Sequence, residues 1–279
     1  MSGKLSIVAT PIGNLGDISG RAKKTLACAD CICAEDTRVT GQLLKAYGIS
    51  AKLERCDENV IASKSAGLVH RLQNGEHIAF CSDAGMPGVS DPGMVLIDAA
   101  RNANIDVEVL PGACAVSTAL VAAAFGGTAF YFGGFLPRKS TQRVKHLESL
   151  KALDASLVFY ESPHRVADAA ADIAKVFPAR RVALCRELTK IHEEVLRLPA
   201  GELAENLAAR DVIKGEIVLV IAPPNNKETE DASFESEEVQ AFIEKQLASG
   251  MQKSKLAKEL AKEFGFSKNE AYEYLHSNK

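Results

Sequence analysis

The sequence contains no tryptophan, few aromatic residues and no strong excess of either charge, since its net charge is −3 and its pI is near 6.1. A chain of this balance is not a polycation, so we expect no DNA partner, and any RNA contact must use local basic patches. Long apolar runs are also absent, and the first run, in MSGKLSIVATP, is cut short by Pro11. It is too short for a signal-peptide core or a membrane span, so we expect a cytoplasmic protein with no membrane partner.

The usual nucleotide-binding fingerprints are missing as well. No G-x-G-x-x-G follows the first apolar run, and no G-x-x-x-x-G-K-[ST] occurs anywhere in the chain. An ordinary dehydrogenase or P-loop NTPase is therefore disfavoured. With 279 residues, of which 47% are hydrophobic and 25% charged, the composition is that of a globular protein long enough for two domains.

The seven cysteines are an odd number and are mostly isolated. This usage favours buried thiols in a reducing compartment over a disulfide framework. Cys28, Cys31 and Cys33 stand close together, but neither a histidine nor a second C-x-x-C lies near them. Alternation along a strand explains their spacing, so we expect no metal site.

Strand-like and helix-like segments alternate along most of the chain. This alternation predicts α/β layers with largely parallel sheets, and an antiparallel hairpin around Ile191 and His192. The expected strands are 5–9, 31–34, 77–81, 107–110, 130–135, 156–160, 181–186, 193–198 and 216–221. The expected helices are 19–30 with Ser19 as N-cap, 59–75, one opening at 91–93, 114–125, and segments following Lys139, Ser162 and Glu202.

After Ile221 the composition changes, and a polar stretch without apolar periodicity follows. We expect an N-terminal α/β domain at 1–113, a C-terminal α/β domain at 114–222, a linker at 223–236 and a helical appendage at 237–279. In the appendage Val239, Phe242, Ile243 and Leu247 share one helical face, and Leu256, Leu260 and Phe264 share another, before a helix capped by Ser267. A docking bundle and a nucleic-acid contact explain this appendage equally well, because its lysines alternate with glutamates.

Polar or glycine-rich turns follow several predicted strands. They are Thr10–Asn14, Glu35–Arg38, Ser82–Gly93, Pro111–Cys114 and Glu161–Arg165. Strand ends of parallel sheets gather at one edge, so these turns are expected to converge on one cleft. The turn SDAGMPGVSDPG at Ser82–Gly93 is the strongest candidate for a ligand-binding loop, because its glycines allow close approach to a ligand; alternatively its aspartates only cap a helix, a role that fits Asp91.

An ordered series of motifs resembles one known family. The motifs are VATPIGNLGD at 8–17, AEDTR at 34–38, the loop 82–93, LPGA at 110–113, FYESPHR at 159–165, CRELTK at 185–190 and KGEIV at 214–218. The chain is similar to the RsmI family, the small-subunit ribosomal RNA (cytidine-2′-O-)methyltransferases of the tetrapyrrole methylase superfamily. The resemblance runs through residues 4–222 and includes the helical appendage.

The resemblance implies a homodimer that binds S-adenosyl-L-methionine between two α/β domains and acts on 16S rRNA in the small ribosomal subunit. It implies cofactor contacts by Pro11, Asp83, Ala84, Gly85, Met86, Cys114, Ala115, Tyr160 and Gly215. Cys114 departs from the serine expected at that position, which puts a side-chain hydroxyl contact there in doubt but leaves a backbone contact open.

Methyl transfer to a ribose hydroxyl is an in-line displacement that needs no metal, so the enzyme mainly aligns the reacting atoms and removes a proton. The candidate bases are Asp36, Glu161, His164, Glu187 and Lys190, and we prefer Glu161 or His164. Arg38, Arg165, Arg186 and Lys190 are the expected phosphate-facing groups. Each has a plainer interpretation; Arg186 and Glu187, for example, form a structural ion pair equally well.

Two other functions compete with rRNA methylation. The same fold and cofactor could serve to methylate a tetrapyrrole or a protein side chain, although the helical appendage and the arginine-bearing motifs argue against this. A third hypothesis is a non-catalytic RNA-binding assembly factor that has kept the scaffold.

Overall fold

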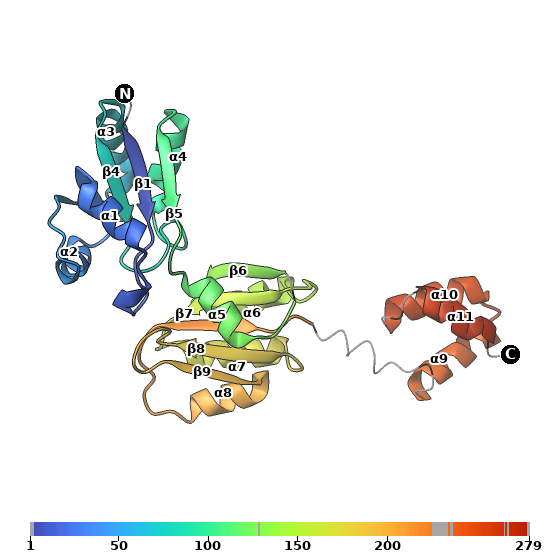
Figure 1. The fold of residues 1–279 in the computed structure, drawn as a ribbon. Coiled ribbons are helices and arrows are strands. Elements are labelled where there is room, and N and C mark those ends of the chain that lie inside the picture. Colours follow the sequence, from blue (N-terminus) through green and yellow to red (C-terminus); the bar gives the residue numbers. More distant parts are fainter. Residues whose placement is uncertain are drawn as a thin grey trace. The chain divides into compact units, whose positions relative to one another are not determined.

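Five short strands of the first half form an all-parallel sheet in the computed structural model of the chain (Figure 1). The sheet order is β3-β2-β4-β1-β5. The strands are β1 (Lys4–Val8), β2 (Cys31–Ala34), β3 (Leu53–Arg55), β4 (His77–Cys81) and β5 (Asp106–Leu110). The helices of this half are the short 3-10 turn η1 (Leu15–Asp17), α1 (Gly20–Cys28), α2 (Thr37–Ala46), α3 (Ile61–Gln73) and α4 (Gly93–Asn102).

The structure describes residues 3–127, 129–224, 234, 237–264, 266 and 268–277. The chain divides into two compact units, Met1–Ala222 and Pro223–Lys279, and the larger unit holds both sheets.

Helices cover both faces of the first sheet. Leu26 of α1 and Leu44 of α2 pack on one face, and α3 and α4 pack on the other around Phe80. Strands covered on both faces must be apolar throughout, which is why β1, β2 and β4 are buried along almost their whole length. Ser19 caps α1 by accepting a hydrogen bond from the Ala22 N–H at 3.0 Å, as predicted.

The second sheet has the order β6-β7-β10-β8-β9 and only one parallel pair, β6 with β7. Its strands are β6 (Phe130–Phe135), β7 (Ser156–Glu161), β8 (Arg181–Arg186), β9 (Glu194–Pro199) and β10 (Ile217–Ile221). The prediction of largely parallel sheets is therefore wrong for this half. Periodicity identifies strands but not their partners, and the insertion of β10 between β7 and β8 makes both of its neighbours antiparallel.

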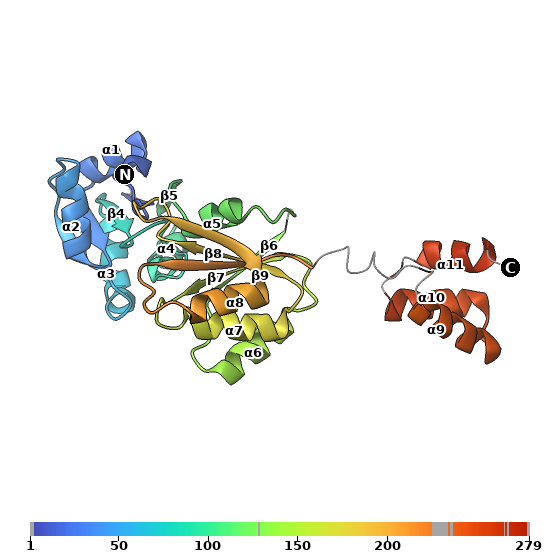
Figure 2. The same ribbon diagram turned by 90° about the horizontal axis from the view of Figure 1, so that it is seen from below.

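Four helices sandwich this sheet. They are α5 (Ala115–Ala123), α6 (Ser140–Ser149), α7 (Val166–Val176) and α8 (Ala200–Ala208). Figure 2 shows α5 on one face and α6, α7 and α8 on the other. The two hydrophobic clusters of this half show the same arrangement. Helix α5 packs against Val158, Ala183 and Val220 on one face, whereas α7 and α8 pack against Phe159 and Leu219 on the other.

The smaller unit contains α9 (Glu237–Ala248), α10 (Lys253–Glu263) and α11 (Lys268–Ser277). Val239, Ile243, Leu256 and Leu260 are buried in its core, as their spacing predicts, but Leu247 is 40% exposed and does not join them. The predicted cap Ser267 and most of the predicted linker lie outside the described residues.

Three local features differ from the sequence prediction. Strand β3 and helix α2 were not predicted, because a three-residue edge strand and a helix starting inside a polar turn leave weak periodic signals. The N-cap position of α4 is Pro92 rather than Asp91, although Asp91 Oδ1 still accepts a hydrogen bond from the Gly93 N–H at 2.8 Å.

Candidate active site

A pocket of about 500 Å³ lies in the larger unit, between loops of the first sheet and strands of the second. The first half contributes the residues at and after the ends of β1, β2 and β4. The second half contributes α5, β7, β8 and the start of β10. The pocket is lined by Ile12, Glu35, Ser82, Asp83, Ala84, Val89, Ser90, Asp91, Ala115, Phe135, Tyr160, Glu161, Ser162, Pro163, Cys185, Leu188, Gly215, Glu216, Ile217 and Val218.

Two backbone segments of the first half are joined at the pocket. Thr10 and Gly85 exchange hydrogen bonds, from the Thr10 N–H to the Gly85 oxygen at 2.9 Å and from the Gly85 N–H to the Thr10 oxygen at 3.1 Å. Gly85 has φ +83°, a conformation that favours glycine, and a Cβ there would lie 3.3 Å from Ile12 Cγ2. The bridge therefore fixes Pro11 and Ile12 beside the Ser82–Gly93 loop.

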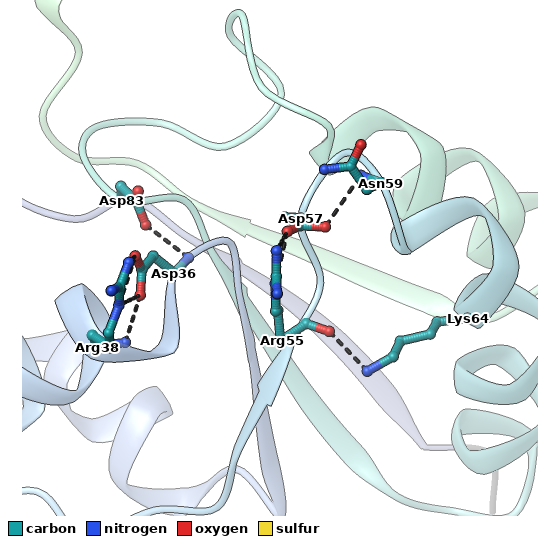
Figure 3. A network of polar contacts seen from close by, with 7 residues as sticks. All are labelled: Asp36, Arg38, Arg55, Asp57, Asn59, Lys64 and Asp83. Atoms are coloured by element: carbon teal, nitrogen blue, oxygen red, sulfur yellow. Dashed lines mark hydrogen bonds and ion pairs between the residues drawn. The ribbon is translucent and has the colours of Figure 1, made fainter.

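Asp83 belongs to a hydrogen-bond network at the end of β4 (Figure 3). Its Oδ1 accepts a hydrogen bond from the Asp36 N–H at 2.9 Å. Asp36 is itself the N-cap of α2, accepting from the Arg38 N–H at 2.8 Å and pairing with the Arg38 guanidinium. Asp36 is thus committed to its own helix, and it does not line the pocket.

A second group of contacts in Figure 3 involves Arg55, Asp57, Asn59 and Lys64, none of which lines the pocket. Arg55 pairs with Asp57, whose Oδ1 accepts the Asn59 N–H at 3.1 Å, and Lys64 donates to the Arg55 oxygen at 2.8 Å. These bonds hold the loop between β3 and α3, so their role is structural.

Two carboxylates of the first half face the pocket with raised pKa values. Burial raises the pKa of Glu35, and the nearby Asp83 charge raises it further, while the Asp83 backbone N–H opposes both. Burial also raises the pKa of Asp83. Carboxyls held closer to neutrality are suited to proton transfer, so Glu35 and Asp83 are candidates for that role.

The loop between these carboxylates and α4 is held by Asp91. Its Oδ1 accepts hydrogen bonds from the Gly88 N–H at 2.7 Å and the Gly93 N–H at 2.8 Å. Val89, Ser90 and Asp91 line the pocket, whereas Met86 does not.

The second half supplies an aromatic wall. The Tyr160 ring meets the rings of Phe132 and Phe135 edge to face, with centroids 5.0 and 5.5 Å apart. Burial raises the pKa of Tyr160 to about 12, so its hydroxyl stays protonated and can donate a hydrogen bond at neutral pH.

Glu161 lines the pocket, but its side chain is fully buried and tied to Arg165. Its Oε1 accepts hydrogen bonds from Arg165 Nε at 2.9 Å and from the Ser162 N–H at 2.7 Å. A carboxylate held in this way acts first as an anchor for Arg165. His164 is exposed and lies outside the pocket lining.

The β8–β9 turn carries a cluster of ion pairs near the pocket. Lys190 Nζ donates to Glu187 Oε1 at 2.7 Å and to Glu216 Oε2 at 3.1 Å. These bonds lower the pKa of Glu187 and, against the effect of burial, raise that of Lys190. Neither shift favours proton abstraction at neutral pH, because Lys190 stays charged and Glu187 becomes a weaker base.

Arg186 is committed in the same region. Its Nε pairs with Glu194 Oε2 at 2.8 Å, and Arg210 Nη2 pairs with Glu194 Oε1 at 2.6 Å. Hydrogen bonds from Arg210 lower the pKa of Glu194 to about 2. Burial opposes this shift, and a hydrogen bond from Arg186 adds to it. Arg186 thus pairs with Glu194, and Glu187 pairs with Lys190, so the two residues do not form the ion pair with each other that their sequence positions suggested.

Six of the residues expected at the site line the pocket, and the others lie beside it or outside it. The lining residues are Asp83, Ala84, Ala115, Tyr160, Glu161 and Gly215. The remainder are Pro11, Asp36, Arg38, Gly85, Met86, Cys114, His164, Arg165, Arg186, Glu187 and Lys190. Gly85 and Cys114 lie next to the lining residues Ala84 and Ala115. Gly85 is bridged to Thr10, and Cys114 is the N-cap of α5.

Sequence reasoning passed over several lining residues. Glu35 belongs to the turn Glu35–Arg38 that the strand-end rule identified, but only Asp36 and Arg38 of that turn were expected to act. Ser90 lies in the predicted ligand-binding loop, and Leu188 and Glu216 lie in two of the family motifs. None of the three was named as a site residue, because antiparallel pairing and loop shape bring them to the pocket.

Cys185 lines the pocket, and Cys114 lies beside it as the N-cap of α5. Cys31, Cys33 and Cys56 are buried, and Cys28 is exposed at the end of α1. Within the described ranges, no group of three or more histidine, cysteine, aspartate or glutamate side chains is arranged to hold a metal ion. Nor is any helix of the described residues long and apolar enough to span a bilayer.

Solved structures share the fold of the larger unit at low sequence identity. The methyltransferase CobJ matches with a TM-score of 0.61 and 18% identity over 80% of this chain and 95% of that one. Uroporphyrin-III C-methyl transferase from Thermus thermophilus, complexed with S-adenyl homocysteine, matches with a TM-score of 0.55 and 15% identity over 78% and 97%. At these identities the likeness establishes the fold.

Sequence comparisons are more specific. The model of the tetrapyrrole (corrin/porphyrin) methylases matches residues 4–204. The ribosomal RNA small subunit methyltransferase I of Halalkalibacterium halodurans is 42% identical over 275 residues, which cover 98% of this chain and 95% of the relative. The protein of the same name from Escherichia coli O157:H7 is also 42% identical over 275 residues, covering 98% and 94%. The chain therefore belongs to the ribosomal RNA small subunit methyltransferase I (RsmI) family of the tetrapyrrole methylases.

Proposed function

We propose that the protein transfers a methyl group from S-adenosyl-L-methionine to the 2′-hydroxyl of a cytidine ribose in 16S rRNA of the small ribosomal subunit. The observation that carries the proposal is a pocket of about 500 Å³, lined from both halves by family motifs, in a chain 42% identical over nearly its full length to named rRNA methyltransferases. A volume of this size is typical of sites for small organic ligands.

The lining suits a cofactor with an apolar body and polar ends. The Asp83 carboxylate and the backbone around Ala84 and Gly85 offer polar contacts, and Gly85 leaves room beside Ile12 that a side chain would fill. Ala115, Tyr160 and Gly215 offer the apolar wall and further backbone groups. When bound, S-adenosyl-L-methionine supplies an electrophilic methyl group.

The enzyme's remaining tasks are alignment and proton removal. Glu35 is our choice of proton acceptor, because it lines the pocket and its pKa is raised, whereas Asp36, Glu187 and Lys190 are committed to other partners. Glu161, as the anchor of Arg165, and the exposed His164 rank behind it. Arg38, Arg165 and Arg186 remain our candidates for contacts with RNA phosphates.

The decisive experiment incubates the protein with S-adenosyl-L-methionine labelled in its methyl group and with small ribosomal subunits that lack the modification. We expect label in 16S rRNA at one ribose 2′-oxygen. Label found only in ribosomal protein, or only in an added tetrapyrrole, would refute the proposal. Subunits that already carry the modification are the control and should take up no label.

Calorimetry tests whether the chain is an enzyme of this class at all. We expect saturable binding of S-adenosyl-L-methionine to the purified protein. No binding would favour a non-catalytic assembly factor. We also propose a homodimer in the cytoplasm, and sedimentation equilibrium at micromolar concentration measures the oligomeric state.

A further inference from the structure

Strand β6 carries an irregularity beside the pocket. Phe132 pairs with Val158, but the next pair is Phe135 with Tyr160, so one extra residue is inserted at Gly133–Gly134. Gly134 has φ +65°, which glycine adopts without strain. In a regular strand, residues three apart point to opposite faces; the inserted residue brings Phe135 to the same face as Phe132, and both rings contact Tyr160.

The segment after the bulge is fixed by two arginines. Arg165 Nη2 donates to the Leu136 oxygen at 3.2 Å. Arg143 Nη1 donates to the Pro137 oxygen at 3.2 Å and to the Arg138 oxygen at 3.3 Å. Three consecutive carbonyls are thus bound by side chains from outside the strand, and we call residues 135–139 the clamped segment.

Each clamping arginine is held in turn by a buried carboxylate. Arg143 Nε pairs with Asp172 Oδ2 at 2.9 Å, and both residues are at least 97% buried, with 3% and 2% exposed. Arg165 pairs with the buried Glu161. Breaking a buried ion pair is costly, so these two carboxylates hold the arginines, and through them the segment, in one position.

The clamped segment presents an unusual surface at the pocket. The Phe135 side chain lines the pocket yet is 59% exposed. Arg138 and Lys139 follow it, and both are exposed. Among the ion pairs that the described residues form, none involves either of them. An exposed ring beside two unpaired cations is poorly explained by packing or by stability.

We propose that the clamped segment is the surface on which the single-stranded RNA next to the target nucleotide lies. Phe135 stacks on one base and Arg138 and Lys139 contact the adjoining phosphates. Sequence-tolerant recognition of unpaired RNA uses this combination, because every base has a π-face and every linkage a negative charge. Arg143, Asp172 and Glu161 are then positioning residues for the segment.

The proposal rests on the proposed function and deepens it, since it concerns how the same pocket receives its substrate. A partner protein with an apolar face would use Phe135 but would have no need of two cations held beside it. The charges favour RNA.

The test compares Phe135→Ala, Phe135→Tyr and the double variant Arg138→Ala/Lys139→Ala with the wild type. Turnover and filter retention of small subunits give KM, kcat and affinity, and calorimetry gives the affinity for S-adenosylhomocysteine. Two variants serve as controls. Phe130→Ala removes a phenylalanine of similar exposure, 50%, at the other end of β6, and Lys151→Ala removes a lysine beyond the C-terminal end of α6.

We expect Phe135→Ala to weaken subunit affinity by about tenfold or more, with Phe135→Tyr restoring it. The double variant should lower the slope of log affinity against log salt by about one to two, since each cation lost removes one phosphate contact. S-adenosylhomocysteine affinity should stay within about twofold in the Arg138→Ala/Lys139→Ala variant, and the control variants should behave as the wild type. In Phe135→Ala, whose ring also lines the pocket, S-adenosylhomocysteine affinity should fall by less than subunit affinity does.

Two results would overturn the inference. One is weaker S-adenosylhomocysteine binding by Phe135→Ala with unchanged subunit affinity, which would make Phe135 part of the cofactor site. The other is wild-type subunit affinity in every variant. If the wild type labels no RNA, the proposed function fails by itself, and the filter-retention result still decides this inference.

Discussion

The two sides of the pocket use charge in opposite ways. On the first-half side the carboxylates Glu35 and Asp83 line the pocket, and Asp83 is hydrogen-bonded to the nearby Asp36–Arg38 pair, whose Arg38 side chain is 86% exposed. On the second-half side the carboxylates Glu161 and Asp172 are buried and hold arginines in place. The first side is equipped for chemistry and the second for positioning.

This comparison is tested most strongly by breaking a buried pair. Asp172→Ala leaves the Arg143 guanidinium buried without its partner, and removal of one member of such a pair costs about 3–5 kcal/mol of unfolding free energy. Urea unfolding measures the loss. A change below about 1 kcal/mol would contradict a positioning role for this pair.

The same pair predicts a pH dependence. Burial raises the pKa of Asp172, but hydrogen bonds from Ser140, Lys175 and Arg143 outweigh it, so the pKa lies below its usual value. The stabilisation is complete above the unfolded-state pKa of about 3.9 and is lost as the pH falls toward the lower folded value. In Asp172→Asn this loss of unfolding free energy at low pH should be absent. Urea unfolding measured across acidic pH values tests it.

The chemical side is tested by Glu35→Gln, which removes the proposed proton acceptor and keeps the shape. We expect kcat to fall by about a hundredfold or more, with little change in S-adenosylhomocysteine affinity. Because the pKa of Glu35 is raised, wild-type activity should decline on acidification at a pH above the usual glutamate value of about 4.3. Glu58→Gln, at an exposed glutamate, is the control; a Glu35 variant with normal kcat would rule this residue out as the base.

A smaller effect is expected from Asp83→Asn. Loss of the charge should weaken S-adenosylhomocysteine binding by about tenfold, the size of one charge-assisted hydrogen bond. Calorimetry measures the change, with Asp154→Asn in an exposed loop as the matched variant. Unchanged affinity would remove Asp83 from the cofactor site.

The smallest effect on stability belongs to Arg38→Ala. Because Arg38 is exposed, we expect no measurable change in urea unfolding, but a few-fold weaker affinity for small subunits if the arginine contacts phosphate. Lys24→Ala on α1 removes the same charge at another exposed position. Equal subunit affinities of the two variants would leave Arg38 without a role in RNA binding.

Much of the first half could be predicted because a parallel sheet places all of its strand ends at one edge. That rule led to the turns Glu35–Arg38 and Ser82–Gly93, which hold the lining residues Glu35 and Asp83, although Asp36 and Arg38 rather than Glu35 were expected at the site. The motifs and their order also led to the family.

The second half resisted the same reasoning. Antiparallel pairing sends successive strand ends to opposite edges, so Glu216 and Leu188 reach the pocket from places that the rule does not cover. Glu161 was expected to be catalytic because it follows a strand, and its pairing with Arg165 four residues on is visible only in three dimensions. The bulge before Phe135 depends on which strand pairs with β6, and no local pattern reveals a register.

The place of β10 has a consequence for biosynthesis. Residues 217–221 are the last strand of the larger unit to leave a ribosome, yet they occupy the middle of the second sheet, and the residues at and just before their start line the pocket. Until they emerge, β8 and β9 can pair with each other but not with β6 and β7. Nascent chains that end before β10 should therefore expose two strand pairs, β6–β7 and β8–β9, that are not joined to each other. Such chains should bind no ligand, so activity requires the final strand.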